Sequence, residues 1–429
     1  MTKFTILQTF IILSTLGTAI TGFSLGLWIL KIYDSTFLYS TISFVSLAPQ
    51  VLCSPFIGSL IDRWDNRKTI LLAQIAGGIG TIILLILFLN GNLYSYTVFI
   101  VIFLSSISKG FVKNGFYATT RLLVSNENLR KAKAQEQIGT AFVMLLSPII
   151  APFILNHYGL SFIFFIDIVS FILTVILFIL YKIPNVKKDK AKINFTTDAK
   201  IVWAFLTREK GLFLILIYYF FNNIFLGGVS ILVPPLVLEI ANENVLGIIM
   251  AISGIGVLTG GIVSSYSTTA NKPIRMILIL NITISVILIL AVFIKIHPII
   301  IACIIFIVMM LSTIVNILTN TFWQSIVPLH LQGRMIGYRT LIMGGAIPLS
   351  YLLGGIVVDY LFKPFFSENS IGILPSHLTD KTSAILLFFF VAGLISFLYS
   401  IITIRNSKIK KLDSIYIQTT QNSITTNND

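Results

Sequence analysis

Long stretches without a single charged residue recur along this chain of 429 residues. Residues 4–30 and 35–61 carry no charge, and residues 69–108 form an uncharged stretch of 40 residues. A helix that crosses a bilayer needs about 20 apolar residues, because each residue advances a helix by about 1.5 Å. Only 11% of the residues are charged and the mean hydropathy is +0.94, which excludes an ordinary soluble domain. The chain is therefore predicted to be a large polytopic membrane protein.

Turn signals divide the apolar stretches into twelve predicted spans. An Asn-Gly-Asn turn at residues 90–92 separates the third span from the fourth, and Asn-His-Tyr-Gly at residues 156–159 separates the fifth from the sixth. The sequence predicts an all-α membrane protein of two similar six-helix bundles, residues 1–181 and 211–404. A basic cytoplasmic linker is expected at residues 182–210. The polar tail at residues 405–429 is expected to be disordered and cytoplasmic.

The positive charges are distributed between the loops in a way that predicts orientation. If the N-terminus is cytoplasmic, 24 of the 30 Lys and Arg residues fall on the cytoplasmic side and four on the outer side. Cytoplasmic loops retain such residues, so both termini are predicted to lie on the cytoplasmic side of the cell membrane. The net charge of +14 is then a topology signal and a means of contacting anionic lipid headgroups. It predicts no nucleic-acid partner.

The cysteines and histidines show no pattern of a metal site. Cys53 and Cys303 both fall inside predicted spans, and the four histidines are scattered along the chain. Metal sites need ligands at short, regular spacings, and disulfides need cysteines outside the lipid. No metal, cofactor or disulfide is therefore expected.

The loop after the second span carries a cluster of charges. Gly58 permits the close approach of a neighbouring helix, and Asp62 places a carboxylate at the membrane edge. Arg63, Arg67 and Lys68 supply donors that can pair with this carboxylate or cap helix C-termini. Such a cluster can stabilise one of two conformations, and we predict that it is a conformational latch. An ordinary basic turn on the cytoplasmic side is the alternative.

This loop and other motifs resemble one family of membrane transporters. The sequence Gly-x-Leu-x-Asp-Arg, followed by basic residues, resembles the signature loop of the major facilitator superfamily. The residues around Trp28 and Pro49, and Gly-Arg-Met at 333–335, are similar to the branch of macrolide-efflux and siderophore-export proteins. The resemblance covers residues 5–404 and implies alternating access, with spans 1, 4, 7 and 10 lining a central cavity. Three positions depart from the family pattern: Asn66 replaces a basic residue, Ser265 an acid, and Ser105 lies near the place of an arginine.

Two lysines lie within the fourth predicted span, Lys109 near mid-membrane and Lys113 one turn closer to the cytoplasm. A charge at such a depth is costly and usually faces the protein interior or water. The two ammonium groups share a helix face and would repel unless an anion, a carboxylate or water lay between them. We predict that Lys109, Lys113 and the neighbouring Asn114 line the cavity and attract an anionic or electronegative solute. Alternatively, Lys113 reaches the cytoplasm and Lys109 pairs with an acid such as Glu136.

Polar side chains recur in the other spans that the resemblance assigns to the cavity. Tyr218 and Asn222 in the seventh span and Trp28 in the first belong to this predicted lining. Amides and aromatic rings suit a partly apolar solute with scattered polar groups, while hydrogen bonding between helices is the alternative use. In the tenth span four polar residues recur every four positions and so share one face: Ser312, Asn316, Asn320 and Gln324.

The energy source is predicted from a missing motif and from a few acids. No Walker-type phosphate loop is present, so an ion gradient, expected to be one of protons, is predicted to drive transport. Asp34, Asp167 and Glu239 are the candidate proton-coupling residues. Asp167 is the deepest of them, in the sixth span, where helix packing is the alternative role. Asp34 and Glu239 lie at the outer ends of spans, where simple solvation is the alternative.

Together these features predict a monomeric secondary active transporter in the lipid bilayer. Its expected substrate is an exported amphipathic small molecule, such as a macrolide-like drug or a siderophore-like product. Uptake of a small anionic solute is the alternative among transporters. A membrane-embedded lipid-modifying enzyme is the alternative from another class, but the outer loops hold no cluster of acids or histidines for catalysis. The chain is therefore predicted not to be an enzyme.

Overall fold

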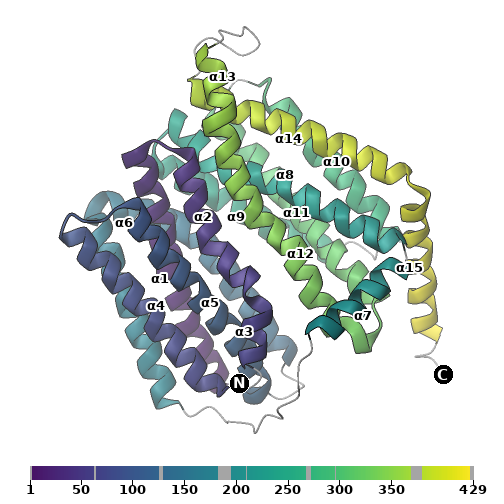
Figure 1. The fold of residues 1–429 in the computed structure, drawn as a ribbon, viewed down its shortest axis with the longest axis horizontal. Coiled ribbons are helices and arrows are strands. Elements are labelled where there is room, and N and C mark those ends of the chain that lie inside the picture. The colour runs from purple at the N-terminus through teal and green to yellow at the C-terminus, as the bar shows by residue number, and fades with distance from the viewer. Residues whose placement is uncertain are drawn as a thin grey trace. The chain divides into compact units, whose positions relative to one another are not determined.

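The computed structural model describes residues 2–61, 64–124, 129–181, 195–208, 210–266, 272–294, 296–368 and 379–425. Every regular element in these ranges is a helix, which confirms the predicted all-α class (Figure 1). The helices form two compact units. The first comprises Met1–Ile193 and Ala241–Ala251, and the second Asn194–Ile240 and Ile252–Asp429.

The first unit contains six helices and the beginning of a seventh. Pro55 interrupts what would otherwise be one helix from residue 36 to residue 61, because it has no N–H to donate to the carbonyl four residues earlier. The longest helix turns sharply at Gly159, whose φ of 77° lies in the left-handed region that glycine tolerates. The bounds are α1 (Thr2–Tyr33), α2 (Thr36–Leu52), α3 (Ser54–Ile61), α4 (Asn66–Leu89), α5 (Ser95–Leu123) and α6 (Leu129–Leu180).

The second unit contains the remaining helices. The predicted linker includes α7, and a π-helical segment, η2, follows α12 without a break. The bounds are α7 (Phe195–Arg208), α8 (Lys210–Ile240), α9 (Glu243–Tyr266), α10 (Pro273–Ala291), α11 (Pro298–Ile326), α12 (Leu329–Ile356), η2 (Val357–Phe362), α13 (Lys363–Glu368), α14 (Asp380–Arg405) and α15 (Ser407–Thr425).

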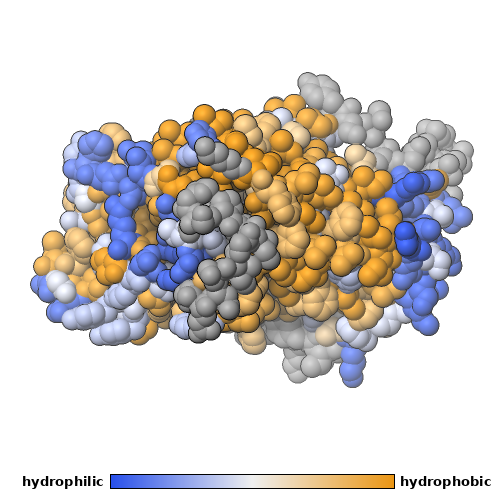
Figure 2. All heavy atoms as spheres, turned by 90° about the horizontal axis from the view of Figure 1, so that it is seen from above, coloured by the Kyte–Doolittle hydropathy of each residue, from blue (hydrophilic) through white to orange (hydrophobic). Residues whose placement is uncertain are grey.

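The described helices account for twelve membrane crossings. Ten helical segments are long and apolar enough to span a membrane, and α2 is a shorter apolar helix. The segment Gln135–Leu180 has 46 residues, so its length of about 70 Å is enough to cross a hydrocarbon core of about 30 Å twice, with the turn at Gly159 between the crossings. Large apolar side chains are exposed on many helices, and hydrophobic residues cover much of the face in Figure 2. Such a surface fits contact with lipid.

Glycines bring α9 and α11 close together inside the second unit. A Cβ atom added at Gly256 would lie 2.6 Å from the carbonyl oxygen of Phe306, and one added at Gly260 would lie 2.5 Å from that of Met310. The two glycines are four residues apart and therefore share one face of α9. Small residues at this spacing let two membrane helices approach at backbone distance.

The C-terminal tail differs from its predicted disorder, because α15 is an ordered helix. Ile409, Leu412 and Tyr416 recur at helical spacing and are at most 3% exposed, packed into the core of the second unit. Asp413 on the same helix accepts hydrogen bonds from the backbone N–H groups of Ile274 (2.9 Å) and Arg275 (3.3 Å) at the start of α10. Apolar contacts and this helix cap order a segment that its composition alone assigned to disorder.

Candidate functional site

The predicted latch loop begins α4 with a carboxylate cap. Asp65 precedes α4, and its Oδ1 accepts hydrogen bonds from the backbone N–H groups two and three residues later, at 2.9 and 3.2 Å. A carboxylate there also interacts favourably with the helix dipole. Gly58 lies in α3, whereas Asp62 and Arg63 lie outside the described residues. The latch role of this loop therefore stays a prediction.

Arg67 connects the start of α4 to the end of α6. Its Nε donates to the carbonyl oxygen of Phe178 (3.0 Å), and its Nη2 donates to that of Ile179 (2.7 Å). Both carbonyls belong to the last turn of α6, where the helix itself supplies no further N–H partner. A cation there also complements the negative end of the helix dipole. Arg67 therefore caps a helix C-terminus, one of the two roles considered for it, while Lys68 is exposed.

Asp167 is completely buried within the first unit. Its Oδ1 accepts a hydrogen bond from Thr18 (3.1 Å) on α1, and its Oδ2 accepts hydrogen bonds from Thr21 (3.2 Å) on α1 and Thr81 (2.9 Å) on α4. Burying a carboxylate without such donors would be strongly unfavourable. Asp167, Thr18, Thr21 and Thr81 are called the Asp167 cluster below. The cluster joins three membrane-spanning segments through one acid.

Lys109 on α5 is the charged residue next to this cluster. It is partly buried, and within the described ranges it is the charged group that acts electrostatically on Asp167. Glu136, the acid suggested as its partner from the sequence, instead accepts a hydrogen bond from Thr120 (3.1 Å). The electrostatic interaction of Lys109 is thus with Asp167 and not with Glu136, the acid offered as an example of its partner. The reason is that α6 turns back at Gly159, so that Asp167, rather than the start of α6, lies at the depth of Lys109 in its span. The cavity role of Lys109 stays a prediction.

The other predicted cavity residues of the first unit have different surroundings. Lys113 is exposed. The Nδ2 of Asn114 donates to the carbonyl oxygen of Gly110 in its own helix (2.9 Å). Trp28 is partly buried, and its ring meets that of Tyr33 edge to face at a centroid distance of 6.3 Å. Lys113 is thus accessible to a solute, whereas Asn114 and Trp28 already have partners within the unit.

Tyr218 and Asn222 on α8 are buried inside the second unit. The hydroxyl of Tyr218 lies 2.8 Å from the Oγ of Ser400 on α14. The Oδ1 of Asn222 accepts a hydrogen bond from Ser396 (2.8 Å), and its Nδ2 donates to the Oδ1 of Asn281 on α10 (3.5 Å). This is the interhelical bonding that the sequence analysis gave as the alternative use of these residues. The cavity role predicted for both residues stays a prediction.

Each unit contains a buried hydrogen bond from a hydroxyl of one helix to a polar side chain of another. Thr81 on α4 donates to Asp167, and Ser285 on α10 donates to the Oγ of Ser396 on α14 (3.0 Å). Each of these two hydroxyls also lies within hydrogen-bond distance of the carbonyl oxygen four residues earlier in its own helix. In the first unit a carboxylate therefore occupies a place that a neutral hydroxyl occupies in the second. The bond in the second unit shows that an interhelical hydrogen bond of this kind forms without an acid.

Asn316 and Asn320 lie on an exposed face of α11, as their spacing predicts. The Nδ2 of Asn316 donates to the carbonyl oxygen of Ser312 in the same helix (3.0 Å). The Oδ1 of Asn320 accepts a hydrogen bond from the Nη2 of Arg339 on α12 (2.6 Å). Sequence reasoning missed Arg339, because it was counted among the cytoplasmic loop charges. We call Ser312, Asn316, Asn320 and Gln324 the polar row of α11.

An apolar pocket of about 90 Å³ lies inside the second unit between α8, α10, α11 and α14. Two hydroxyl side chains, Ser230 and Ser312, interrupt a lining that otherwise consists of apolar side chains. Ser312 also begins the polar row, so the pocket adjoins that row at one residue. The sequence did not predict this pocket, because its walls come from four helices far apart in the chain.

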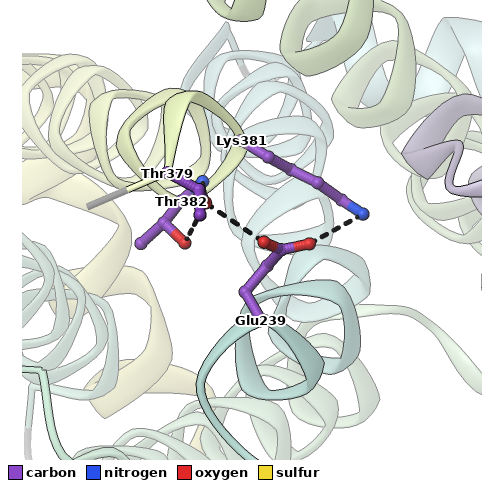
Figure 3. A network of polar contacts seen from close by, with 4 residues as sticks. All are labelled: Glu239, Thr379, Lys381 and Thr382. Carbon is purple, nitrogen blue, oxygen red and sulfur yellow. Dashed lines mark hydrogen bonds and ion pairs between the residues drawn. The ribbon is translucent and has the colours of Figure 1, made fainter. Parts of the chain in front are cut away.

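Glu239 at the end of α8 is bound to the start of α14 (Figure 3). Its Oε1 lies 3.0 Å from the Nζ of Lys381, and its Oε2 accepts a hydrogen bond from Thr379 (3.1 Å). Lys381 is only 7% exposed, so this pairing offsets part of the cost of burying its charge. Asp34 differs, since it is exposed just after α1 with a φ of 44°. Of the three candidate acids, Asp167 has the deepest burial.

The part of the chain that the structure describes contains no group of three or more His, Cys, Asp or Glu residues that could hold a metal ion. The described cysteines, Cys53 and Cys303, are both free thiols. The candidate site therefore consists of hydroxyls, amides and a few charges, which suit binding better than metal-assisted chemistry.

Comparison with known proteins identifies the family. The sequence matches the family model described as Major Facilitator Superfamily over residues 9–351. It is 28% identical over 180 residues to Macrolide efflux protein A of Enterococcus faecalis, an alignment that covers 41% of this chain and 55% of that protein. It is 27% identical over 207 residues to Macrolide efflux protein A of Streptococcus pyogenes, with 48% and 51% covered. The alignments thus span about half the length of these relatives.

Solved structures have the same fold. The nucleoside transporter NupG matches with a TM-score of 0.68 and 16% identity, covering 95% of this chain and all of that one. A bacterial homologue of the iron transporter ferroportin, in an inward-facing state, matches with a TM-score of 0.65 and 14% identity, covering 94% and 99%. At these identities the likeness concerns the fold alone. The family model nevertheless covers most of the chain, so the prediction of a transporter rather than an enzyme is confirmed, and the chain belongs to the Major Facilitator Superfamily.

Proposed function

We propose that this protein exports an amphipathic small molecule, such as a macrolide, across the cell membrane by alternating access, with a proton gradient as the driving force. The two relatives named Macrolide efflux protein A support both the direction and the substrate class. The distribution of Lys and Arg supports cytoplasmic termini. A monomer is sufficient for this function, because each chain carries both bundles.

The observation that carries this proposal is the junction of the apolar pocket with the polar row at Ser312. An amphipathic solute needs apolar contact area and a small number of well-placed hydrogen-bond partners. The pocket offers the first through aliphatic side chains. The polar row offers the second through the exposed amides of Asn316 and Asn320, with the guanidinium of Arg339 bonded to Asn320. A pocket of about 90 Å³ holds an apolar branch of such a solute rather than all of it.

The experiment is an accumulation assay in cells that lack their own macrolide exporters. Expression of the chain should lower the steady-state content of a labelled macrolide, and a protonophore should restore it. Ser312→Leu should reduce this effect, because a larger side chain fills the pocket where it meets the polar row. An unchanged macrolide content on expression of the wild-type chain contradicts the proposed substrate class.

The matched control is Thr283→Leu on α10. Thr283 carries an exposed hydroxyl that is bonded to the carbonyl oxygen of Ile279 in its own helix (3.1 Å), whereas Ser312 is partly buried. Thr283 does not line the pocket. Replacement of this hydroxyl by the same leucine side chain should therefore leave export unaffected. Equal losses in both variants would mean that the substitution disturbs the membrane helices generally, and the role of Ser312 would be withdrawn.

Uptake of a small anionic solute is the second candidate, and specific cations favour it. Lys113 is exposed on α5, and Arg339 lies beside the polar row. Each of these cations can attract an anion over a short range. Proteoliposomes separate the candidates, since counterflow of a labelled anion would support uptake, and counterflow of a neutral macrolide would support export of amphipathic solutes.

A further inference from the structure

We propose that Asp167 is the carboxyl that binds the coupling proton, and that the hydroxyl of Thr18 switches from donor to acceptor when the proton arrives. This inference rests on the proposed proton-driven function and deepens it. It starts from the comparison of the two units, in which a buried acid occupies the place of a neutral hydroxyl. A buried charge at such a place needs another explanation. Reversible protonation of Asp167 is one, and it requires that the hydrogen bonds around the acid satisfy both the ionised and the protonated state.

The ionised state of Asp167 is satisfied by three donors. Thr18 donates to Oδ1 at 3.1 Å, while Thr21 and Thr81 donate to Oδ2 at 3.2 and 2.9 Å. A buried carboxylate is stable only with several such donors. Gly17 allows this arrangement, because a Cβ atom at that position would lie 2.9 Å from Oδ1. The absence of a side chain there brings α1 against the acid.

The protonated state of Asp167 can be satisfied by the same residues without movement of the helices. Thr18 has a second acceptor, the carbonyl oxygen of Ser14, at 3.0 Å. A hydroxyl carries one proton and two acceptor lone pairs, so Thr18 can donate to Ser14 while it accepts the new proton of the acid on Oδ1. Thr21 and Thr81 continue to donate to Oδ2. One proton is added, one hydroxyl rotates, and no buried polar group loses its partner.

The surroundings of the cluster limit what else can act on this acid. The neighbouring α1 presents the hydroxyls of Thr18 and Thr21, and α4 presents that of Thr81. In the described part of the chain the charged group that acts on Asp167 is Lys109 of α5, whose side chain is partly exposed. The ammonium stabilises the ionised acid, so a solute that screens or displaces Lys109 would favour protonation. This gives substrate and proton a direct electrostatic link.

The first test is infrared difference spectroscopy of the full chain in detergent, recorded between acidic and alkaline pH. The wild type should show the carbonyl band of a protonated buried carboxylic acid. Asp167→Asn should remove this band, and Glu136→Gln, which changes another acid of α6 that is bonded to a threonine, should retain it. Persistence of the band in Asp167→Asn would overturn the proposal.

A pair of threonine variants then separates proton binding from simple packing. Thr18→Val removes one hydrogen bond from the ionised state and two from the protonated state, so the acid band at a fixed intermediate pH should fall about fivefold. The second acceptor of Thr81, the carbonyl oxygen of Gly77, lies at 3.5 Å, the limit of hydrogen bonding, so Thr81 acts mainly as a donor to Asp167. A donor bonds an anion more strongly than a neutral acid, so the band should rise about fivefold in Thr81→Val. Both variants make the same isosteric change. Shifts in the same direction would contradict the proposed switch of Thr18.

Transport in proteoliposomes tests the role of Asp167 in coupling. Asp167→Asn should retain downhill counterflow of the substrate and lose accumulation driven by a pH gradient. Accumulation that persists, or that follows a sodium gradient in the wild type, would overturn the proposal. The infrared result does not depend on the substrate. A correct acid band without macrolide transport would therefore reject the substrate class alone, and macrolide transport without the band would reject the proton site alone.

Discussion

Arg67 donates a hydrogen bond of 2.7 Å from its Nη2 to the carbonyl oxygen of Ile179. The two residues are 112 positions apart, so this bond joins the loop after the second span to the end of the sixth. Together with the carboxylate cap of Asp65, it gives the loop two defined helix-end contacts. The described end of the loop is thus fixed to the start of α4 and to the end of α6.

We expect Arg67→Lys to destabilise the protein although it keeps the charge. A lysine cannot reproduce the two-pronged donation to neighbouring carbonyls that the guanidinium makes. The loss should be about 1–2 kcal/mol, measured as a lower Tm in detergent. Lys68→Ala is the control, because Lys68 is exposed and should change the Tm little. Equal Tm values for Arg67→Lys and the wild type would show that the capping bonds contribute nothing.

Asp62→Asn tests the latch that the sequence predicts. The substitution removes one charge and preserves the size of the side chain, so transport should become slower while abundance in the membrane stays near that of the wild type. The measurement is the initial efflux rate, normalised to the amount of protein. Asp34→Asn is the control for loss of a carboxylate at the edge of a span. Full transport by Asp62→Asn would remove the latch role.

Asn316→Leu should reduce the export of an amphipathic substrate about fivefold, the value of one hydrogen bond. Asn316 is exposed on α11, next to the hydroxyl that adjoins the pocket, and leucine keeps a similar size without the amide. Dose-response curves for a macrolide in expressing cells provide the measurement. The variant Thr321→Val changes another exposed polar residue of α11 outside the polar row and should be neutral. A neutral Asn316→Leu would exclude the row from substrate binding.

The pair of Glu239 and Lys381 should be more sensitive to loss of one partner than to loss of both. Glu239→Gln removes the negative charge that lies 3.0 Å from the ammonium of Lys381, which is only 7% exposed, at a cost of about 1–3 kcal/mol. The double variant Glu239→Gln/Lys381→Met removes the buried ammonium as well and should recover much of the stability. Thermal unfolding of both variants measures the difference. A double variant less stable than Glu239→Gln would contradict this account.

Asp413 should make the stability of the protein depend on pH in the acidic range. Burial raises the pKa of its carboxyl above the usual 3.8, against the opposing effect of the Ile274 and Arg275 backbone N–H groups. The folded state therefore binds the proton more tightly, and the free energy of unfolding falls as pH rises from about 3.8 through the raised folded value. Asp413→Asn should remove this slope, and Asp380→Asn, an exposed acid, should retain it. The measurement is the Tm of each variant across this pH range. If the Tm of Asp413→Asn still falls as pH rises, other groups cause the pH dependence.

The tail shows where composition misled the prediction. Residues after Leu412 are rich in Thr, Asn, Gln and Ser, which by itself indicates disorder. The apolar residues Ile409, Leu412 and Tyr416 recur at helical spacing, and this periodicity was the available signal. What completes the helix is its cap on α10 by Asp413, a contact across 138 and 139 positions of sequence. No local pattern contains such a contact.

The amino-acid sequence by itself determined that this chain crosses a membrane about twelve times and belongs to a transporter fold, because hydropathy and charge act residue by residue on insertion into lipid. It did not distinguish Asn222, which is buried and bonded to α14, from Asn316, which is exposed. Both look alike along the chain, since each is an amide in an apolar helix. Only tertiary packing sets the rotation of a helix about its axis, and that rotation decided which polar groups hold the helices together and which remain for a solute.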